Sequence, residues 1–455
     1  MGAHRTDQDM TQGVIWKHFV RFSLPMMLGL LFQQMYNTVD TLVVGRFVGT
    51  EALAAVGSTN SIINMLVGLS AGLSTGASVI ISQRYGAHDV KGLHDAVHTT
   101  ITVTLILCAL LTCLGVLIVQ PMLKMMSTPE EVFGEAQSYL TIYFGGIAGL
   151  LIYNMGSAIL RAVGDSKRPL YFLVFSALMN TGLDLLFVVV LHMGVEGVAW
   201  ATIIAQGMSA ALVLFSLSHD HAAYGIRWNS LGIRKDMLGS ILSVGLPSGV
   251  QQGLTAFSNV FVQSYINAFG AACMAGYSSY NKLDAFILIP VQAIAMASTT
   301  FVGQNWGANK PERARQGVRQ ALILSIVCTV SLTIGMLLLA RPLLSLFSPE
   351  EEVIEYGVRF ISIVTPFYFT ICFNQIFGGA LRGVGNAKAP MVIMLCSFVV
   401  FRQIYLFTVS RLIGGFVPVA LGYPMGWVVC STSLFICYKH SVLARGKQQM
   451  QQVTA

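Results

Sequence analysis

The sequence predicts an all-α polytopic membrane protein with 12 transmembrane helices in two pseudo-symmetric six-helix lobes. Three observations carry this prediction. Hydrophobic residues make up 55% of the 455 residues and charged residues only 10%, whereas a soluble protein of this length needs far more charge to cover its surface. Apolar runs long enough to cross a bilayer recur along the chain, and the second half of the sequence repeats the first.

The internal repeat is clearest in two decapeptides. LRAVGDSKRP at residues 160–169 returns as LRGVGNAKAP at residues 381–390, with six of ten positions identical at an offset of 221. Almost the same register aligns Pro25 with Pro247. Paired homologous halves in an apolar chain are typical of transporters whose site lies between or within the repeats.

The apolar runs predict the individual spans. A helix that rises about 1.5 Å per residue needs about 20 residues to cross roughly 30 Å of hydrocarbon. We expect spans at residues 16–45, 52–83, 95–120, 132–160, 168–191, 196–217, 238–267, 272–303, 318–340, 353–381, 390–411 and 416–438. Several runs exceed the minimum length, so we expect those helices to tilt or to project beyond the bilayer.

The loops between the runs predict the orientation of the chain. If both termini are cytoplasmic, twenty Lys and Arg residues lie on the inner side and four lie outside, namely Arg46, Lys124, Arg341 and Arg411. The positive-inside rule favours this orientation. Each half has an even number of spans, so the halves run in the same sense, related by an axis along the membrane normal. The net charge of +7 is then a topology signal, and we expect no nucleic-acid partner.

The predicted domains are an N-lobe at residues 1–217 that carries a cation site, a cytoplasmic inter-lobe linker at 218–237, and a C-lobe at 238–455 that ends in a short cytoplasmic tail. The linker is too short to fold as a domain, and the chain has no GxxxxGK[ST] motif. Transport is therefore driven by an ion gradient or runs downhill. We expect no enzyme activity, no metal other than a possible Na⁺, and no cofactor other than the coupling ion.

Polar side chains of the N-terminal half predict where that ion binds. Asp40 and Asp184 lie in apolar spans, where a charge is costly enough to suggest a function. Asn180 shares a helix face with Asp184, and Thr202 and Tyr139 lie at comparable depth. Oxygen ligands suit Na⁺, and two close carboxylates also hold a proton, so both ions remain open. The alternative is that each acid only bonds neighbouring helices.

The C-terminal copy lacks this polar set. The repeat aligns the four ligand positions with apolar or aromatic residues: Asp40 with Val262, Asn180 with Phe401, Asp184 with Tyr405 and Thr202 with Tyr423. A purely structural role for the acids would more naturally be shared by both copies, so the asymmetry favours a coupling role.

The C-terminal half has three intramembrane charges of its own, Lys282, Asp284 and Arg402. Asp284 and Arg402 lie at depths that allow them to pair. We expect a buried ion pair that joins two spans, a structural explanation at least as good as a transport role because the basic partner already neutralises the acid.

The chain resembles the multidrug and toxic compound extrusion (MATE) family, in its prokaryotic branch, over essentially its whole length. The resemblance is carried by SLPMMLGLLFQQMYNTVDTLVVGRFVGTEALAAVG at 23–57, by Q-x-x-G-A turns at 83–87 and 304–308, and by the two L-R-x-V-G-x-x-K-x-P turns. It implies two six-helix lobes around a central cleft. It also implies export of cationic or amphipathic compounds in exchange for Na⁺ or H⁺.

Residue by residue, the resemblance implies roles for positions of the N-lobe. It implies a cation site at Asp40, Asn180, Asp184 and Thr202, a polar network at Tyr139, Asn154, Tyr36 and Asn37, cleft residues Gln33 and Gln34, and a hinge at Pro25. NorM-type members also use acids in spans 7 and 10. This chain has none there, and Asn374 is the nearest polar group in span 10, which favours a DinF-like mechanism coupled in the N-lobe.

Together these observations predict a monomeric antiporter of a bacterial cytoplasmic membrane, with both termini cytoplasmic, that exports small-molecule drugs and toxins. The alternative within the same superfamily is a flippase for lipid-linked precursors. The twelve spans and the few charges expected in the cleft argue against a flippase. A channel or a receptor gains nothing from paired buried acids in one lobe.

Overall fold

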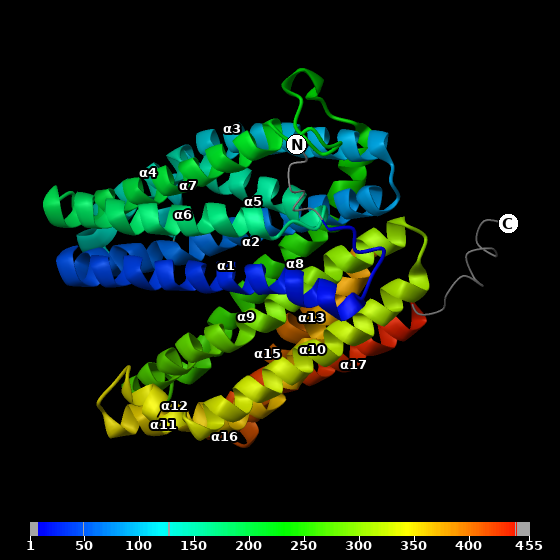
Figure 1. Cartoon of the computed structure of the whole chain (residues 1–455). Helices are drawn as coiled ribbons and strands as arrows, with labels where there is room; N and C mark the ends of the chain where they lie inside the picture. The colour runs from blue at the N-terminus through cyan, green and yellow to red at the C-terminus, as the bar shows by residue number, and fades with distance from the viewer. Residues whose placement is uncertain (1–7, 49, 126–127, 442, 444–455) are drawn as a thin grey trace. The chain divides into compact units, whose positions relative to one another are not determined.

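The computed structural model describes residues 8–48, 50–125, 128–441 and 443, and every regular element among them is a helix (Figure 1). The predicted all-α fold class is thereby confirmed. The described helices group into six spans in each half, because several neighbouring helices follow one another with little or no break.

The spans of the first half begin and end close to the predicted limits. They are α1 (Ile15–Val43) with the π-helical turn η1 (Val44–Val48), α2 (Thr50–Gly86), α3 (Val90–Met125), α4 (Glu130–Gly145) with α5 (Ile147–Ala162), α6 (Lys167–Asp184) with the π-helical turn η2 (Leu185–Val190), and α7 (Gly194–Ser218). The segment that follows contains one 3₁₀ turn, η3 (Trp228–Ser230).

The second half repeats this arrangement. Its spans are α8 (Lys235–Asn267), α9 (Ala271–Gly307), α10 (Pro311–Leu338) with the short α11 (Ala340–Ser345), α12 (Glu351–Val364) with the 3₁₀ turn η4 (Thr365–Phe367) and α13 (Tyr368–Gly383), α14 (Lys388–Leu395) with the π-helical turn η5 (Cys396–Phe401) and α15 (Arg402–Leu412), and α16 (Phe416–Ala420) with α17 (Gly422–His440).

Ten of these spans can be recognised as membrane-spanning from the length and composition of their helices. Nine described helices are apolar and long enough to cross a membrane, and the pair α4 and α5, bent by 46°, makes ten. The other two spans are α1 and α8, which carry amides such as Gln33 and Asn37 in the first and Gln252 and Asn259 in the second. The polarity of these two equivalent helices sets them apart from the rest of the bundle.

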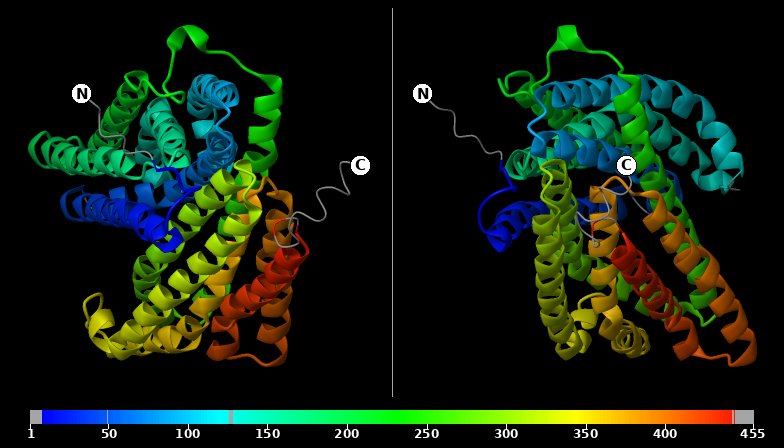
Figure 2. Two further views of the ribbon diagram at one scale, coloured as in Figure 1. Left: turned by 45° about the vertical axis from the view of Figure 1, so that its right-hand side comes forward. Right: turned by 90° about the vertical axis from the view of Figure 1, so that its right-hand side faces the viewer.

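The chain divides into two compact units, and the helices of each lie side by side as a bundle (Figure 2). Unit 1 comprises Leu28–Gly245 and the described residues before Met10, and unit 2 comprises Met10–Met27 and the chain from Leu246 onward. In unit 1, α5 packs on α2, α3 and α7, and in unit 2, α9 packs on α10, α12 and α13.

The division differs from the predicted lobes at both polar helices. Residues 10–27 belong to unit 2 because the backbone of Met10 bonds the side chains of Gln304 and Asn305, and Phe19 packs on Phe301 with ring centroids 5.1 Å apart. Helix α1 therefore passes from one unit to the other two residues after Pro25, and α8 does so just before Pro247. The role of Pro25 as a hinge stays a prediction.

The repeated decapeptide forms the same helix–turn–helix in both halves. The amide of Asp165 donates to Leu160 O and that of Asn386 to Leu381 O, each at 2.9 Å, which closes a helix end whose next-to-last residue is a left-handed glycine. These glycines are Gly164 (φ 89°) and Gly385 (φ 92°). The following Asp or Asn side chain then accepts backbone amides of the next helix. The decapeptide is thus repeated in both halves because its residues form the same turn in each.

We expect Gly164→Ala to destabilise the protein by about 1–3 kcal/mol, because a side chain at positive φ is strained. The added Cβ would also collide with the backbone oxygen of Gln8. Thermal unfolding in detergent measures the effect. Gly182→Ala in α6 is the matched control, since a Cβ there meets no atom within 4 Å. Equal melting temperatures for the two variants would contradict this account of the turn.

The linker between the halves is fixed to unit 1 at several points. Arg168, at the start of α6, donates to Asp165, to Asp220 Oδ2 at 2.9 Å and to Tyr224 Oη at 3.2 Å. His98 Nε2 accepts the Arg227 amide at 2.9 Å. These bonds attach the linker to the ends of α3 and α6.

Candidate cation site

Three predicted side chains meet between α1 and α6 of unit 1. When the side-chain amide of Asn180 is oriented so that both of its ends are satisfied, its nitrogen donates to Asp40 Oδ1 at 2.8 Å and to Asp184 Oδ2 at 3.2 Å. Asn180 is 1% exposed and Asp184 is fully buried. The structure therefore brings together two acids and an amide that lie about 140 residues apart in the sequence.

Local helix geometry places Asn180 and Asp184 on one face, since they are four residues apart in α6. The π-helical turn η2 begins at the next residue, Leu185. Such turns interrupt the regular hydrogen bonding of an α-helix and are frequent at functional sites. An apolar cluster of Val43, Val188, Val198 and neighbouring residues packs around this end of unit 1. It keeps the local dielectric low.

The two carboxyl groups also lie within hydrogen-bonding reach of each other. A carboxyl–carboxyl bond exists only when one of the pair carries a proton, because two carboxylates have no donor to share. Asp184 Oδ1 is buried and has no hydrogen-bond partner in the described part of the chain. The site therefore has both a shared proton position and a free oxygen lone pair, which is the chemistry that loading with H⁺ or Na⁺ requires.

Three further predicted residues belong to the same unit, and two of them lie near this pair. Tyr36 and Tyr139 both lie within electrostatic range of Asp40 and Asp184. The Thr202 hydroxyl donates to Val198 O at 2.9 Å within α7, a helix that packs on α6. That bond uses the hydroxyl proton and leaves the oxygen lone pairs available to a cation.

The resemblance implies further residues on α1 and α5. Asn154 of α5 donates to Ser70 Oγ of α2 at 3.3 Å, and no described hydrogen bond joins it to the acids. Gln33 and Asn37 are exposed on α1, and Gln34 is half-buried. Roles for these residues in a cleft stay predictions.

The predicted ion pair of the C-terminal half is wrong. Asp284 accepts hydrogen bonds from the hydroxyls of Tyr368 and Tyr280, and Arg402 donates instead to Ser258 and Asn259 of α8. Lys282 is exposed, with its Nζ 5.3 Å from the centre of the Phe347 ring. Among the described residues no ion pair includes Asp284. The hydroxyls of two tyrosines thus satisfy the hydrogen-bonding capacity of the Asp284 carboxylate. The sequence does not indicate this role, because an aromatic residue in an apolar span is normally interpreted as part of the hydrophobic core.

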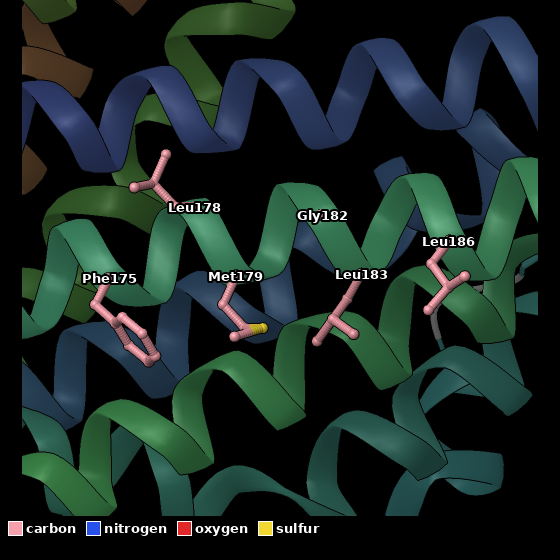
Figure 3. A pocket seen from close by; sticks show the side chains of 6 residues that line it. All are labelled: Phe175, Leu178, Met179, Gly182, Leu183 and Leu186. Atoms are coloured by element: carbon pink, nitrogen blue, oxygen red, sulfur yellow. The ribbon is translucent and has the colours of Figure 1, made fainter.

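The face of α6 opposite Asn180 and Asp184 is mainly apolar. A shallow groove there is lined by Phe175, Leu178, Met179, Gly182, Leu183 and Leu186 (Figure 3). The spacing of these residues follows one helix face. One side of α6 is thus built for an apolar environment and the other for the carboxylate pair.

Comparison with known proteins gives matches in both halves of the chain. The MatE family model matches residues 25–186 and 247–408, which confirms the internal repeat. "Probable multidrug resistance protein YpnP" of Bacillus subtilis is 29% identical over 437 residues, covering 95% of this chain and 96% of the relative. "Probable multidrug resistance protein YoeA" of the same organism is 27% identical over 456 residues, covering 98% of this chain and 97% of the relative.

The fold also matches solved structures. One described as "Outward-facing conformation of a multidrug resistance MATE family transporter of the MOP superfamily" superposes with a TM-score of 0.91 at 24% identity, covering 98% of this chain and 100% of the other. The match extends over both halves and supports the prediction of twelve transmembrane helices in all.

Proposed function

The chain belongs to the MatE family of multidrug and toxic compound extrusion transporters, and we propose that it is a secondary antiporter that exports drug-like molecules in exchange for protons. The observation that carries this proposal is the contact of Asp40, Asn180 and Asp184. Relatives named as multidrug resistance proteins support the substrate class.

The carboxyl pair is the proposed coupling element. Two carboxylates in contact at low dielectric repel each other, so one of them takes a proton when it becomes accessible from the outer side. With the pair deprotonated, unit 1 carries negative charge that attracts a cationic compound. Protonation removes that charge and favours release. Na⁺ bound to Asp184 Oδ1 would act in the same way, and the experiment below separates the two ions.

We further propose that the protein is a monomer in the bacterial cytoplasmic membrane with both termini in the cytoplasm. The excess of basic residues on one side, twenty against four, supports that orientation. Cysteine accessibility in intact cells measures it, in a variant whose eight native cysteines are replaced, with single cysteines placed at Lys124 for the outer side and at Lys235 for the inner side.

Ethidium efflux under separately imposed gradients tests the function. Proteoliposomes containing the purified protein receive a proton gradient at equal Na⁺, or a Na⁺ gradient at equal pH. We expect dye movement with the proton gradient alone. Movement with the Na⁺ gradient alone would assign Na⁺ to the pair, and no movement with either would overturn the antiporter assignment.

We expect Asp184→Asn to reduce proton-driven efflux more than Asn180→Ala does, because removing a charge from an ion site costs more than removing one neutral donor. A loss of about tenfold for Asn180→Ala corresponds to one hydrogen bond to a charged group. Asn229→Ala is the control, since it removes an exposed amide from the 3₁₀ turn η3. Initial rates of efflux at several imposed pH gradients provide the measurement.

An equal pH dependence in Asn180→Ala, Asn229→Ala and the unmodified protein would show that the Asn180 amide only packs the helices.

A further inference from the structure

The largest fully buried side chain of unit 2 is a guanidinium. Arg402, the first residue of α15, is 2% exposed. Its Nη2 donates to Ser258 Oγ at 2.7 Å and to Asn259 Oδ1 at 2.9 Å, and its guanidinium carbon lies 5.2 Å from the centre of the Tyr423 ring. The Nε atom is buried without a hydrogen-bond partner, and no described carboxylate pairs with the group.

A buried positive charge is costly unless an anion approaches it with good geometry. Asp284 lies in the same part of unit 2, since both Asp284 and Arg402 act electrostatically on Tyr277 and Tyr423. Its oxygens, however, are bonded by Tyr280 and Tyr368. The guanidinium therefore lacks a hydrogen-bonded anion within the described part of unit 2.

The repeat places this guanidinium on the pair of helices equivalent to the pair that holds the carboxylates, although not at the aligned positions. Helices α1 and α6 hold Asp40 and Asp184 in the first half, and the equivalent helices α8 and α15 hold Asn259 and Arg402 in the second. Each site adjoins a π-helical turn, η2 after Asp184 and η5 before Arg402. The two equivalent helix pairs thus carry opposite charges.

An approach to the guanidinium is available along α8. Asn259 is exposed, and its amide nitrogen donates to no described atom, while its oxygen holds Arg402. Gln252, Thr255, Asn259 and Gln263 recur at spacings of three and four residues, which puts them on one face of α8. A ligand on this polar face meets the Asn259 amide first and the Arg402 guanidinium behind it.

We propose that Arg402 and Asn259 form a binding subsite for an oxyanion group, a carboxylate or a phosphate, of the transported compound. The free donors, Nε–H of Arg402 and the amide of Asn259, suit the two oxygens of such a group. The proposal rests on the function proposed above and narrows its substrate class to compounds that carry an acidic group as well as a cationic one.

A matched pair of fluorescent dyes tests the subsite. Rhodamine 110 carries a free carboxylate, and rhodamine 123 is its methyl ester. Fluorescence polarisation with the purified full-length protein in detergent gives both dissociation constants. We expect tighter binding of rhodamine 110 by about tenfold, the range of one charge-assisted hydrogen bond. We expect Arg402→Gln to abolish this preference while rhodamine 123 binds as before.

Two control variants separate recognition from folding. Arg411→Gln removes an exposed guanidinium from the same helix and is expected to keep the preference. Asn259→Ala leaves Arg402 in place and is expected to weaken the preference only partly. If both dyes bind equally to the unmodified protein, or if Arg402→Gln weakens both dyes alike and Asp284→Asn restores them, the guanidinium serves Asp284 and the proposal is wrong.

A lipid phosphate is the other source of the same chemistry. Rhodamine 110 binding is therefore repeated with added phosphatidylglycerol or with phosphatidylcholine at equal concentration. Competition by phosphatidylglycerol alone would assign the subsite to a lipid headgroup and overturn the substrate assignment. Proton-driven export of rhodamine 123, measured separately in proteoliposomes, tests the antiporter function without involving the subsite.

Discussion

Replacement of Asp40 by Asn is expected to abolish proton-driven export while the protein stays folded in the membrane. Asp40 is the acceptor for the Asn180 amide and the partner of the Asp184 carboxyl. An asparagine keeps the size of the side chain and its hydrogen-bonding oxygen but cannot take up a proton. Dye efflux from proteoliposomes under an imposed pH gradient should fall to the rate of protein-free liposomes.

A matched control for this variant is Asp236→Asn, which removes an exposed acid from the first turn of α8. It is expected to export at the unmodified rate. Melting temperatures in detergent identify variants that fail because they unfold. Export by folded Asp40→Asn protein at the unmodified rate would show that the coupling ion does not use this acid, and the tyrosine-bound Asp284 of unit 2 would become the next candidate.

The spans could be predicted closely because bilayer thickness limits their length. The predicted runs at 272–303 and 390–411 correspond to Ala271–Gly307 and to Lys388–Leu412 in the structure. The bend between α4 and α5 and the π-helical turns could not be predicted. They depend on local packing and backbone bonding, such as the contact of Gly146 with Ile203, and leave no trace in hydropathy.

The shared position of Asn180 and Asp184 could be predicted from the sequence for a related reason. Asn180 and Asp184 are four residues apart in one helix, so the sequence specifies both their depth and their shared face. For Asp284 and Arg402 the sequence specifies depth alone, because the rotation of two separate helices depends on packing. The structure turns Arg402 toward α8 and Asp284 toward Tyr368, so residues at matching depth do not meet.

Replacement of Arg168 by Ala is expected to lower the free energy of unfolding by about 3 kcal/mol, because it leaves a buried carboxylate without its cation. The Asp165 side chain is fully buried beneath the guanidinium. The second repeat forms the same turn without a charged pair of side chains. Asn386 accepts the amide of Ala389 at 3.2 Å, in the positions equivalent to Asp165 and Arg168.

The double variant Asp165→Asn/Arg168→Ala reproduces the neutral pair of the second repeat and is expected to regain most of the lost stability. Some loss remains because Asp220 also bonds Arg168 at 2.9 Å. Although burial opposes it, the bonds from Ala222 and Arg168 hold the pKa of Asp220 below its usual value. That contribution is present at neutral pH and is lost as the pH falls through the folded-state pKa, so the residual difference should shrink in acid.

Unfolding in detergent at several pH values measures both effects, with Lys167→Ala as the control. A double variant no more stable than Arg168→Ala would mean that Arg168 stabilises the fold through the linker, at Asp220 and Tyr224, and not through the buried acid.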